Sequence, residues 1–357
     1  MQIMMNDTLP VSATGIRPVG ATMREDDRER NLIRLILESF RTDEIEASCR
    51  REGISQEELL GLREAFICAG AARVHDLLRP SVWYQVGVGL DPFGFQLTTF
   101  MTGPCHDRIR SWLHEGKIDR FFFLNKPPGL RLRFRASLGD LLPELSSWLD
   151  EQRKEGEITS WSRGVYEAEV HQFGGELGLD IAHAFFTAES IAVMGYRRLQ
   201  LDDAETFSSP DFSLFLLNDF FQRVVEDRWE LWDLWCNMAL TERVPTFQGA
   251  DLDRAVALAD AARGHILELL DDRGPFLERI SDAGRALLVE YQNQTRPIAE
   301  RLRAARDEGA LLYGLRQILP FWVIFHWNRM GFAIEHQQRL VFMILRALDP
   351  KRTVTLP

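Results

Sequence analysis

The stretch "FFFLNKPPGLRLRFR", residues 121–135, decides how the centre of the chain is read. It contains two strand-like segments, Phe121–Leu124 and Leu130–Phe134, separated by a Pro-Pro-Gly break. In an extended segment, alternate side chains share one face. The second strand therefore presents leucine and phenylalanine to the core on one face. The other face carries three arginines, Arg131, Arg133 and Arg135.

These three arginines have two interpretations. They are either the solvated outer face of a half-buried sheet or an anion-binding site. The guanidinium fork binds carboxylate or phosphate in a bidentate way, so a row of three could form such a site. The residue types alone leave both interpretations open.

The segments on either side extend the pattern to β-α-β-β-α-β. This order is typical of a ferredoxin-like sheet, so we predict an α+β fold with a ferredoxin-like sheet region. The added elements are a strand at Val82–Val88, a helix at Pro104–Glu115, a helix at Asp140–Glu155 and a strand at Ile158–Val170.

The remainder of the chain reads as helical and divides into further parts. We predict a flexible tail over residues 1–25, a small helical bundle over 26–79, an α+β domain over 80–348 and a tail over 349–357. Ser55 and Glu58 have the spacing of a capping box that opens a helix. The helices expected after the sheet are Leu179–Met194, Phe212–Met238, Leu252–Asp271, Ile280–Asp307 and Leu311–Leu348.

Composition limits the function. The chain has 357 residues and a net charge of −11, which argues against binding nucleic-acid backbone. The four cysteines lack metal-ligand spacing and any disulfide framework, so we expect free thiols in the cytoplasm, no metal and no cofactor. We find no signal peptide and no apolar run long enough to cross a membrane.

A second polar cluster lies in "YEAEVHQFGGELGLDIAHAFFTAES", residues 166–190. Tyr166, Glu169 and His171 lie near a strand end, and Gly174-Gly175 predicts a sharp turn before a helix. His171 and His183 are candidate acid or base groups, because imidazole titrates near neutral pH. The alternative is that His183 only caps or packs.

A third cluster lies in "FWVIFHWNRMGF", residues 321–332. His326, Asn328 and Arg329 are polar residues within an aromatic helix, and buried polar groups need partners. They form either a structural hydrogen-bond network or one wall of a pocket. The tryptophans at 229, 232 and 235 similarly read as a buried helix face or as a substrate platform.

Taken together and in this order, the three clusters resemble one family. They are similar to the C-terminal elimination domain of class I lantibiotic dehydratases. They are more similar still to the stand-alone form found in thiopeptide-type bacteriocin biosynthesis. The helical stretch "RTDEIEASCRREGISQEELLGLREAFICAGAARV", residues 41–74, resembles the N-terminal region of some stand-alone members, so the resemblance covers roughly residues 30–348.

The resemblance implies a maturation enzyme for ribosomally made, post-translationally modified peptides. Full dehydratases glutamylate Ser or Thr from glutamyl-tRNA, and their elimination domain then removes the glutamate. Relatives of the same fold are pyridine synthases, which join two dehydroalanines in a formal [4+2] cyclisation and then lose water and the leader peptide. The chain is too short to hold the glutamylation domain as well, so we expect no tRNA partner.

Two departures bear on the reaction. Elimination domains usually carry arginine just before the aromatic-Gly-Gly turn, where this chain has Gln172. They also tend to place histidine four residues before the Asn of the Asn-Arg pair, where this chain has Ile324. Both departures weaken glutamate elimination and favour the cyclase hypothesis.

We therefore carry three hypotheses. The first is a pyridine-synthase-like lyase or cyclase that acts on a dehydroalanine-containing precursor peptide, with Tyr166, His171 and His183 as catalytic residues. The second is glutamate elimination, and the third is a non-catalytic peptide-binding partner of other biosynthetic enzymes. We expect a leader and core peptide as substrate and no membrane. The expected substrate-binding residues are Arg131, Arg133, Arg135, Glu169, His326, Asn328 and Arg329.

Overall fold

The computed structural model describes residues 25–41, 46–78, 82–91, 96–137, 139–202, 207–239, 241, 247, 249–271 and 273–349. The chain divides into two compact units, Met1–Pro80 and Ser81–Pro357. The tails expected at 1–25 and 349–357 lie outside the described residues, apart from Glu25 and Asp349.

The first unit contains the helices α1 (Glu25–Glu38), α2 (Glu46–Glu52) and α3 (Gln56–Leu78). The predicted capping box at the start of α3 is confirmed. The backbone N–H of Ser55 donates to the Glu58 carboxylate at 2.7 Å, and the N–H of Glu58 donates to the Ser55 hydroxyl at 3.1 Å. Among the side chains that the structure describes in this unit, Leu35, Ile36, Cys49 and Leu59 form a buried apolar cluster.

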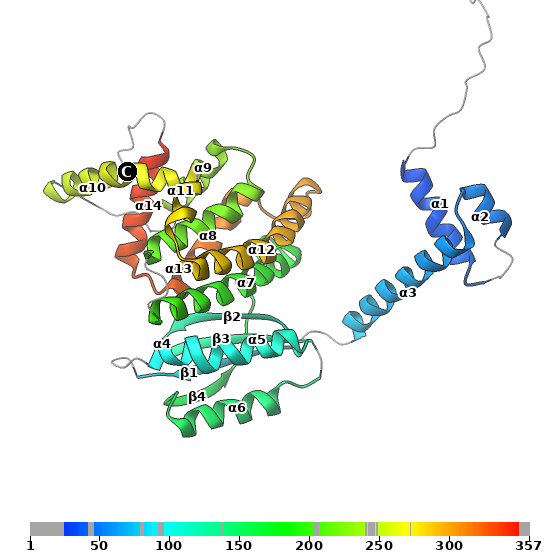
Figure 1. Cartoon of the computed structure of the whole chain (residues 1–357), viewed down its shortest axis with the longest axis horizontal. Helices are drawn as coiled ribbons and strands as arrows, with labels where there is room; N and C mark the ends of the chain where they lie inside the picture. The colour runs from blue at the N-terminus through cyan, green and yellow to red at the C-terminus, as the bar shows by residue number, and fades with distance from the viewer. Residues whose placement is uncertain are drawn as a thin grey trace, which may run out of the picture. The chain divides into compact units, whose positions relative to one another are not determined.

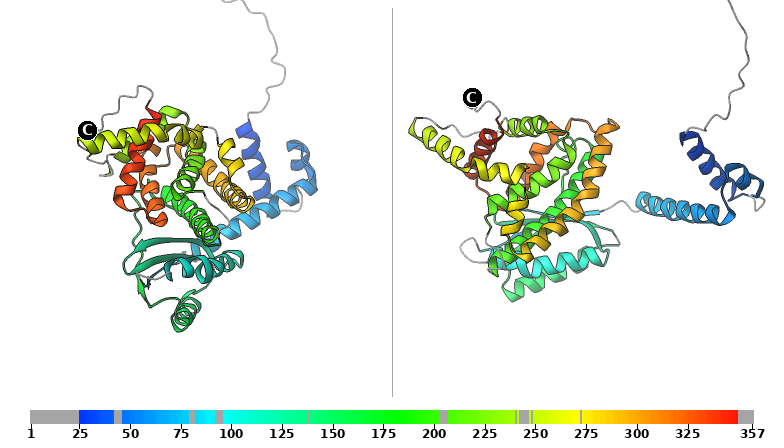
Figure 2. Two further views of the ribbon diagram at one scale, coloured as in Figure 1. Left: turned by 60° about the vertical axis from the view of Figure 1, so that its left-hand side comes forward. Right: turned by 45° about the horizontal axis from the view of Figure 1, so that its top comes forward.

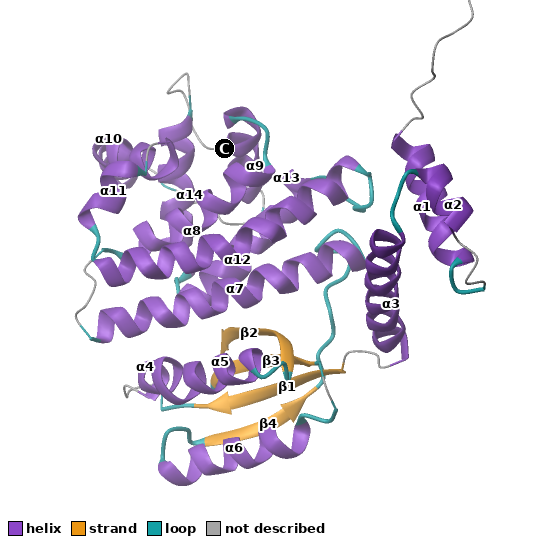
Figure 3. Ribbon diagram, turned by 45° about the vertical axis from the view of Figure 1, so that its right-hand side comes forward, coloured by secondary structure: helices purple, strands orange, loops and turns teal. Residues whose placement is uncertain are grey.

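The second unit is rich in helix and is built on a small antiparallel sheet (Figure 1). The four strands lie in the order β2-β3-β1-β4, and every neighbouring pair is antiparallel. Figure 3 shows them as one sheet between two sets of helices. The strands are β1 (Val82–Gly89), β2 (Ile118–Lys126), β3 (Gly129–Ala136) and β4 (Ser160–Gly164).

One face of the sheet carries the leucine and phenylalanine side chains of β3. They pack against helices that come from the two connections within the sheet region. Trp112 of α5 contacts Phe134 with 5.8 Å between the ring centroids, and it also contacts Trp148 of α6. The elements in these connections are α4 (Gln96–Phe100), the π-helical turn η1 (Met101–Cys105), α5 (His106–His114) and α6 (Leu142–Glu155).

The opposite face carries the arginines, and α7 (Glu176–Leu201) lies across it. Figures 1 and 2 show α7 between the sheet and the other helices of this unit. By length and composition α7 could span a membrane, but 78% of that window is buried inside the structure. Such burial is typical of a core helix. Beyond it lie α8 (Ser209–Val224), α9 (Arg228–Ala239), α10 (Ala250–Asp271), α11 (Gly274–Arg279), α12 (Asp282–Asp307), α13 (Leu315–Met330) and α14 (Ile334–Leu348).

Three sequence-based boundaries are wrong. The helix expected at Phe212–Met238 is two helices, α8 and α9, because the backbone turns extended at Val225. The helix expected at Leu311–Leu348 is also two, because Gly331 adopts a left-handed conformation that ends α13. The strand expected to reach Val170 ends at Gly164.

The tryptophans of α9 do not form one buried face. Trp229 is 60% exposed, whereas Trp235 is buried, so the side chains of this helix pass from solvent into the core. No platform of three parallel rings results from this arrangement, because Trp229 and Trp232 meet edge to face at 90°.

Candidate functional site

Arg133 lies at the centre of the arginine face of the sheet and is only 4% exposed. Its Nε donates to Oε1 of Gln85, its register partner on β1, at 2.9 Å. Gln85 in turn donates from Nε2 to the carbonyl oxygen of Val165 at 2.9 Å. One glutamine therefore fixes both the arginine and the segment that follows β4.

Tyr166 and His183 meet beside this arginine. The Tyr166 Oη lies 2.6 Å from Nε2 of His183, and the Arg133 guanidinium carbon lies 4.2 Å from the centroid of the tyrosine ring. The His183 ring also packs on Trp83 and Phe122, at centroid distances of 4.4 and 5.6 Å. The pair is therefore enclosed by aromatic rings and one cation.

Burial keeps both members of this pair neutral. It lowers the pKa of His183 to about 3, and the nearby Arg135 acts in the same direction. Burial also raises the pKa of Tyr166 well above its usual range, although Arg133 acts to lower it. At neutral pH the site therefore holds an uncharged imidazole hydrogen-bonded to an uncharged phenol, which can pass a proton without leaving a lasting charge.

Two buried polar atoms beside the pair have no hydrogen-bond partner within the described part of the chain. They are Nη1 of Arg133, which is a donor, and Oε2 of Glu169, which is an acceptor. Both residues act electrostatically on Tyr166. A buried polar atom without a partner is costly, so this donor and acceptor are suited to a bound polar group.

The other two arginines of β3 differ from Arg133. Arg135 is engaged by two carboxylates: it contacts Asp119 through Nε and Nη2 and donates from Nη1 to Asp180 at 2.8 Å. Arg131 is partly exposed and lies opposite Gly87, so no side chain of β1 covers it there. The three arginines share a face as expected, but their surroundings are not equivalent.

The Gly-Gly turn is confirmed, since both Gly174 and Gly175 have positive φ, at 84° and 96°. His171 is exposed in this turn and lines an open surface pocket together with Glu169 and Gln172. Among the described residues, no hydrogen bond joins His171 to the Tyr166–His183 pair. Of the two histidines, only His183 is joined to the arginine face, and the catalytic role of His171 stays a prediction.

The third cluster forms a buried network. His326 contacts the Glu189 carboxylate through Nδ1 at 2.7 Å and the Ser213 hydroxyl through Nε2 at 2.8 Å. Arg329 forms an ion pair with the same carboxylate, and all three charged or titratable side chains are fully buried. Burial alone would raise the pKa of Glu189, but Arg329 and His326 hold it below its usual range.

Asn328 forms its side-chain hydrogen bonds with the backbone of Asn125 and not with the buried network. Its Oδ1 accepts from the backbone N–H of Asn125 at 2.8 Å, and its Nδ2 donates to the Asn125 carbonyl at 3.1 Å. It therefore attaches α13 to the end of β2. The predicted contact of His326, Asn328 and Arg329 with a substrate stays a prediction. His326 and Asn328 already use their polar groups within the protein. Arg329 pairs with Glu189 through Nη2, while its Nε and Nη1 are buried without a hydrogen-bond partner among the described residues.

Sequence reasoning missed three residues of the site. Gln85 contacts Arg133, Trp83 contacts His183, and Asp119 contacts Arg135. Trp83 and Gln85 alternate along β1, so the strand period would have placed them on the arginine face. Asp119 lies at a bulge between Ile118 and Arg120, and no residue pattern in the sequence predicts this bulge.

The family model described as lantibiotic biosynthesis dehydratase C-terminal matches residues 94–348. No curated protein matches the chain.

Solved structures also resemble the chain. The tRNA-dependent lantibiotic dehydratase MibB from Microbispora sp. 107891 is 17% identical with a TM-score of 0.53, and the match covers 74% of this chain. It covers 28% of MibB, so the chain corresponds to little more than a quarter of that protein. TsrL is 15% identical with a TM-score of 0.49, covering 75% of this chain and 94% of TsrL. TbtD, a pyridine synthase from thiomuracin biosynthesis, is 16% identical with a TM-score of 0.42, covering 74% and 97%.

Proposed function

The chain belongs to the lantibiotic biosynthesis dehydratase C-terminal family, and from this premise we propose that it is a maturation enzyme for a ribosomally made peptide. Its substrate would be a precursor peptide, with leader and core, that already bears dehydroalanines. Its reaction would be a pyridine-synthase-like formal [4+2] cyclisation. Family membership supports the class of enzyme, and the candidate site supports the reaction.

The observation that carries this proposal is the unpaired donor and acceptor beside a neutral proton relay. An amide offers a carbonyl oxygen and an N–H, which match Nη1 of Arg133 and Oε2 of Glu169. The cyclisation needs an amide to become its iminol tautomer, with the proton leaving nitrogen and one arriving on oxygen. Glu169 would take the first proton, and Tyr166, hydrogen-bonded to His183, would supply the second. When the oxygen later leaves as water, it would carry the proton from Glu169, and the ring C–H proton lost in the same step would return to Tyr166.

The rest of the reaction balances without a further reagent. The iminol supplies a C=C–N=C diene, and a second dehydroalanine supplies the alkene. Two carbon–carbon bonds close the six-membered ring, the iminol oxygen then leaves as water, and the leader leaves as its amide. Most of the acceleration would come from holding the two alkenes side by side. The enclosing rings of Trp83 and Phe122 would exclude water from that geometry.

Glutamate elimination remains the second candidate, because Nη1 of Arg133 could equally bind a carboxylate. Two observations disfavour it. Arg135 is already neutralised by Asp119 and Asp180 and so does not offer a free fork to glutamate. His183, whose pKa is about 3, is a weak base for an α-proton.

A single assay separates the hypotheses. The full chain is offered a glutamylated peptide and a bis-dehydroalanine peptide, each with its leader, and the products are weighed by mass spectrometry. Cyclisation predicts loss of water and leader from the second peptide only. Loss of glutamate from the first would overturn the cyclase proposal, and leader binding without any mass change would favour a non-catalytic partner.

We also infer the finer organisation of the fold. The strand order β2-β3-β1-β4, with helices after β1 and β3, supports a ferredoxin-like sheet region. The division at Pro80 and the capped helix α3 support a separate N-terminal helical domain before the family domain. The proposed partner is the precursor peptide, in the cytoplasm; tRNA and membranes have no part in the proposal.

A further inference from the structure

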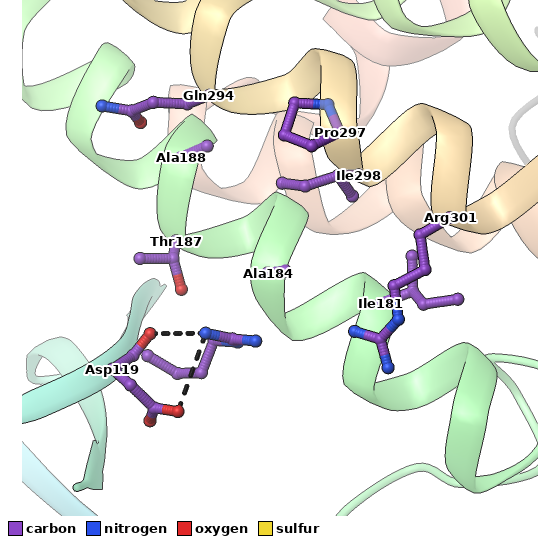
Figure 4. Close-up of a pocket in the computed structure, with 10 residues that line it drawn as sticks. Asp119, Ile181, Ala184, Thr187, Ala188, Gln294, Pro297, Ile298 and Arg301 are labelled. Carbon is purple, nitrogen blue, oxygen red and sulfur yellow. Dashed lines mark hydrogen bonds and ion pairs between the residues drawn. The ribbon is translucent and has the colours of Figure 1, made fainter. Parts of the chain in front are cut away.

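A pocket separate from the Tyr166–His183 pair is lined by residues of β2, α7 and α12. We call it the Arg120 pocket; it has a volume of about 380 Å³. Figure 4 shows residues of α7 and α12 converging on it from above and Asp119 from the sheet. The residues that line it include Arg120, Ala184, Thr187, Gln294, Pro297 and Arg301.

The bulge in β2 gives this pocket its charge. Because the register shifts between Ile118 and Arg120, Asp119 reaches Arg135, while Arg120 remains the register partner of Arg135 and lies at the pocket wall. The Nη1 of Arg120 donates to the backbone carbonyl of Asp119 at 2.8 Å. Its Nε is buried and has no partner anywhere in the described ranges.

The local charges do not cancel. Arg135 forms ion pairs with both Asp119 and Asp180, and Arg301 pairs with the other carboxylate oxygen of Asp180 at 2.7 Å. Arg120 is left with the Asp119 carboxylate at 3.7 Å. Three guanidinium groups thus share two carboxylates, in a chain whose net charge is −11. The surplus positive charge lies at the pocket wall.

The rest of the lining is mixed: it is apolar at Ile181, Ala184, Ala188, Pro297 and Ile298, and it carries polar atoms at Asp119, Thr187 and Gln294. Ala184 and Pro297 contribute no polar side-chain atom, so the pocket suits a carboxylate on a short aliphatic stem. A neighbouring pocket shares Thr187 and Gln294 and is also lined by Arg110 and Glu290, which form an ion pair at 2.9 Å. A groove with this continuation suits an extended chain rather than a free small ion.

We infer that the Arg120 pocket binds the carboxylate of an aspartate or glutamate side chain in the peptide substrate. This inference rests on the proposed function for the identity of the peptide, but not on the reaction. Arg120 would donate from Nε, and Arg301 would attract the same carboxylate from the mouth of the pocket. A charge-assisted hydrogen bond from a buried donor favours carboxylate over the neutral amide of the same shape.

The test is binding to the full chain, measured by fluorescence anisotropy at low ionic strength. The probes are a labelled alanine-rich octapeptide with one central glutamate and the same peptide with glutamine. We expect the glutamate peptide to bind about tenfold more tightly, which corresponds to about 1.4 kcal/mol. Arg120→Met should abolish this preference, and Ala184→Leu should also abolish it by filling the pocket without changing charge.

The matched control is Arg153→Met, which removes the same charge from an exposed position of α6. It should keep the preference, and thermal unfolding should show that all three variants are folded. Competition with free glutamate identifies the source of the carboxylate. If micromolar free glutamate displaced the labelled peptide, the site would bind the free amino acid, and the inference of a peptide ligand would be overturned.

Equal binding of the two peptides would also overturn the inference, as would a preference that survives both pocket variants. Neither result touches the cyclase proposal, whose readout is a mass change in a separate substrate. Conversely, an enzyme that converts neither substrate could still prefer the glutamate probe, so the two failures are distinguishable.

Discussion

The Tyr166 Oη lies 2.6 Å from Nε2 of His183, and both groups are held neutral by burial. If the pair relays a proton, then Tyr166→Phe removes the relay but keeps the ring beneath Arg133. We expect turnover of the bis-dehydroalanine peptide to fall about 10²–10⁴-fold, the usual contribution of a positioned acid or base, with little change in peptide binding. Single-turnover mass spectrometry measures the rate.

The control for this variant is Tyr84→Phe, which deletes a hydroxyl that donates to Asp140 at 2.7 Å on the opposite face of the same sheet. Its rate should match that of the unaltered chain. Equal rates for both variants would remove Tyr166 from the mechanism.

Arg133 should not be replaceable by lysine. Its guanidinium donates from Nε to Gln85 while Nη1 stays free for substrate, and lysine has one nitrogen for both tasks. Arg133→Lys should therefore lower turnover about 10–100-fold, the loss expected for one hydrogen bond to a charged group. The exposed Arg163→Lys on β4 is the matched control. Full activity of Arg133→Lys would show that only a positive charge is needed there.

The strand period accounts for what could be predicted of this site. Alternation alone put Arg131, Arg133 and Arg135 on one face, and the register then brings Gln85 and Phe122 beside Arg133. The interpretation of this face as solvated is wrong for Arg133, which is only 4% exposed because the Tyr166 ring packs against its guanidinium. A half-buried sheet differs from a fully buried one in whether other elements pack on its second face. The sequence of a single strand does not show whether a helix packs there.

Other contacts could not be predicted because their partners are distant in the chain. The polar residues of α13 were expected to need partners, but Glu189 and Ser213 lie 137 and 113 positions away. Tyr166 falls within the strand expected at Ile158–Val170 but lies beyond Gly164, where the strand ends, so the strand pattern does not indicate that it meets His183. Tertiary packing, and not local pattern, determines both contacts.

Acid should destabilise the fold through His183. The pKa of His183 is about 3 in the folded chain, against an ordinary value of 6.5. Below pH 6.5 the unfolded chain therefore binds a proton at this residue that the folded chain does not bind. Between pH 7.5 and pH 5 this one group should cost about 2 kcal/mol of unfolding free energy. His183→Gln should remove that share of the difference in urea denaturation. An unchanged pH dependence would show that His183 is accessible to protons.

The buried ion pair of Glu189 and Arg329 should matter more than any exposed pair. Glu189→Gln leaves Arg329 charged and unpaired inside the core, which should cost about 3–5 kcal/mol of unfolding free energy. Adding Arg329→Met should recover part of that loss, because the uncompensated charge is gone. The exposed pair of Asp233 and Arg316 is the control, and Asp233→Asn should cost less than about 1 kcal/mol. A cost for Glu189→Gln as small as that of the control would contradict the network.

The turn that carries His171 depends on close contact at Gly178. A Cβ added there would lie 2.0 Å from the backbone oxygen of Phe173, so Gly178→Ala must push the turn away from α7. We expect a loss of about 1–3 kcal/mol in unfolding free energy, together with reduced turnover because Glu169 lies just before the turn. Gly264→Ala is the control: it lies in α10 with no atom within 4 Å of the added Cβ, and should stabilise the chain by about 0.5–1 kcal/mol. If Gly178→Ala were as stable and as active as Gly264→Ala, the position of this turn would have no part in the site.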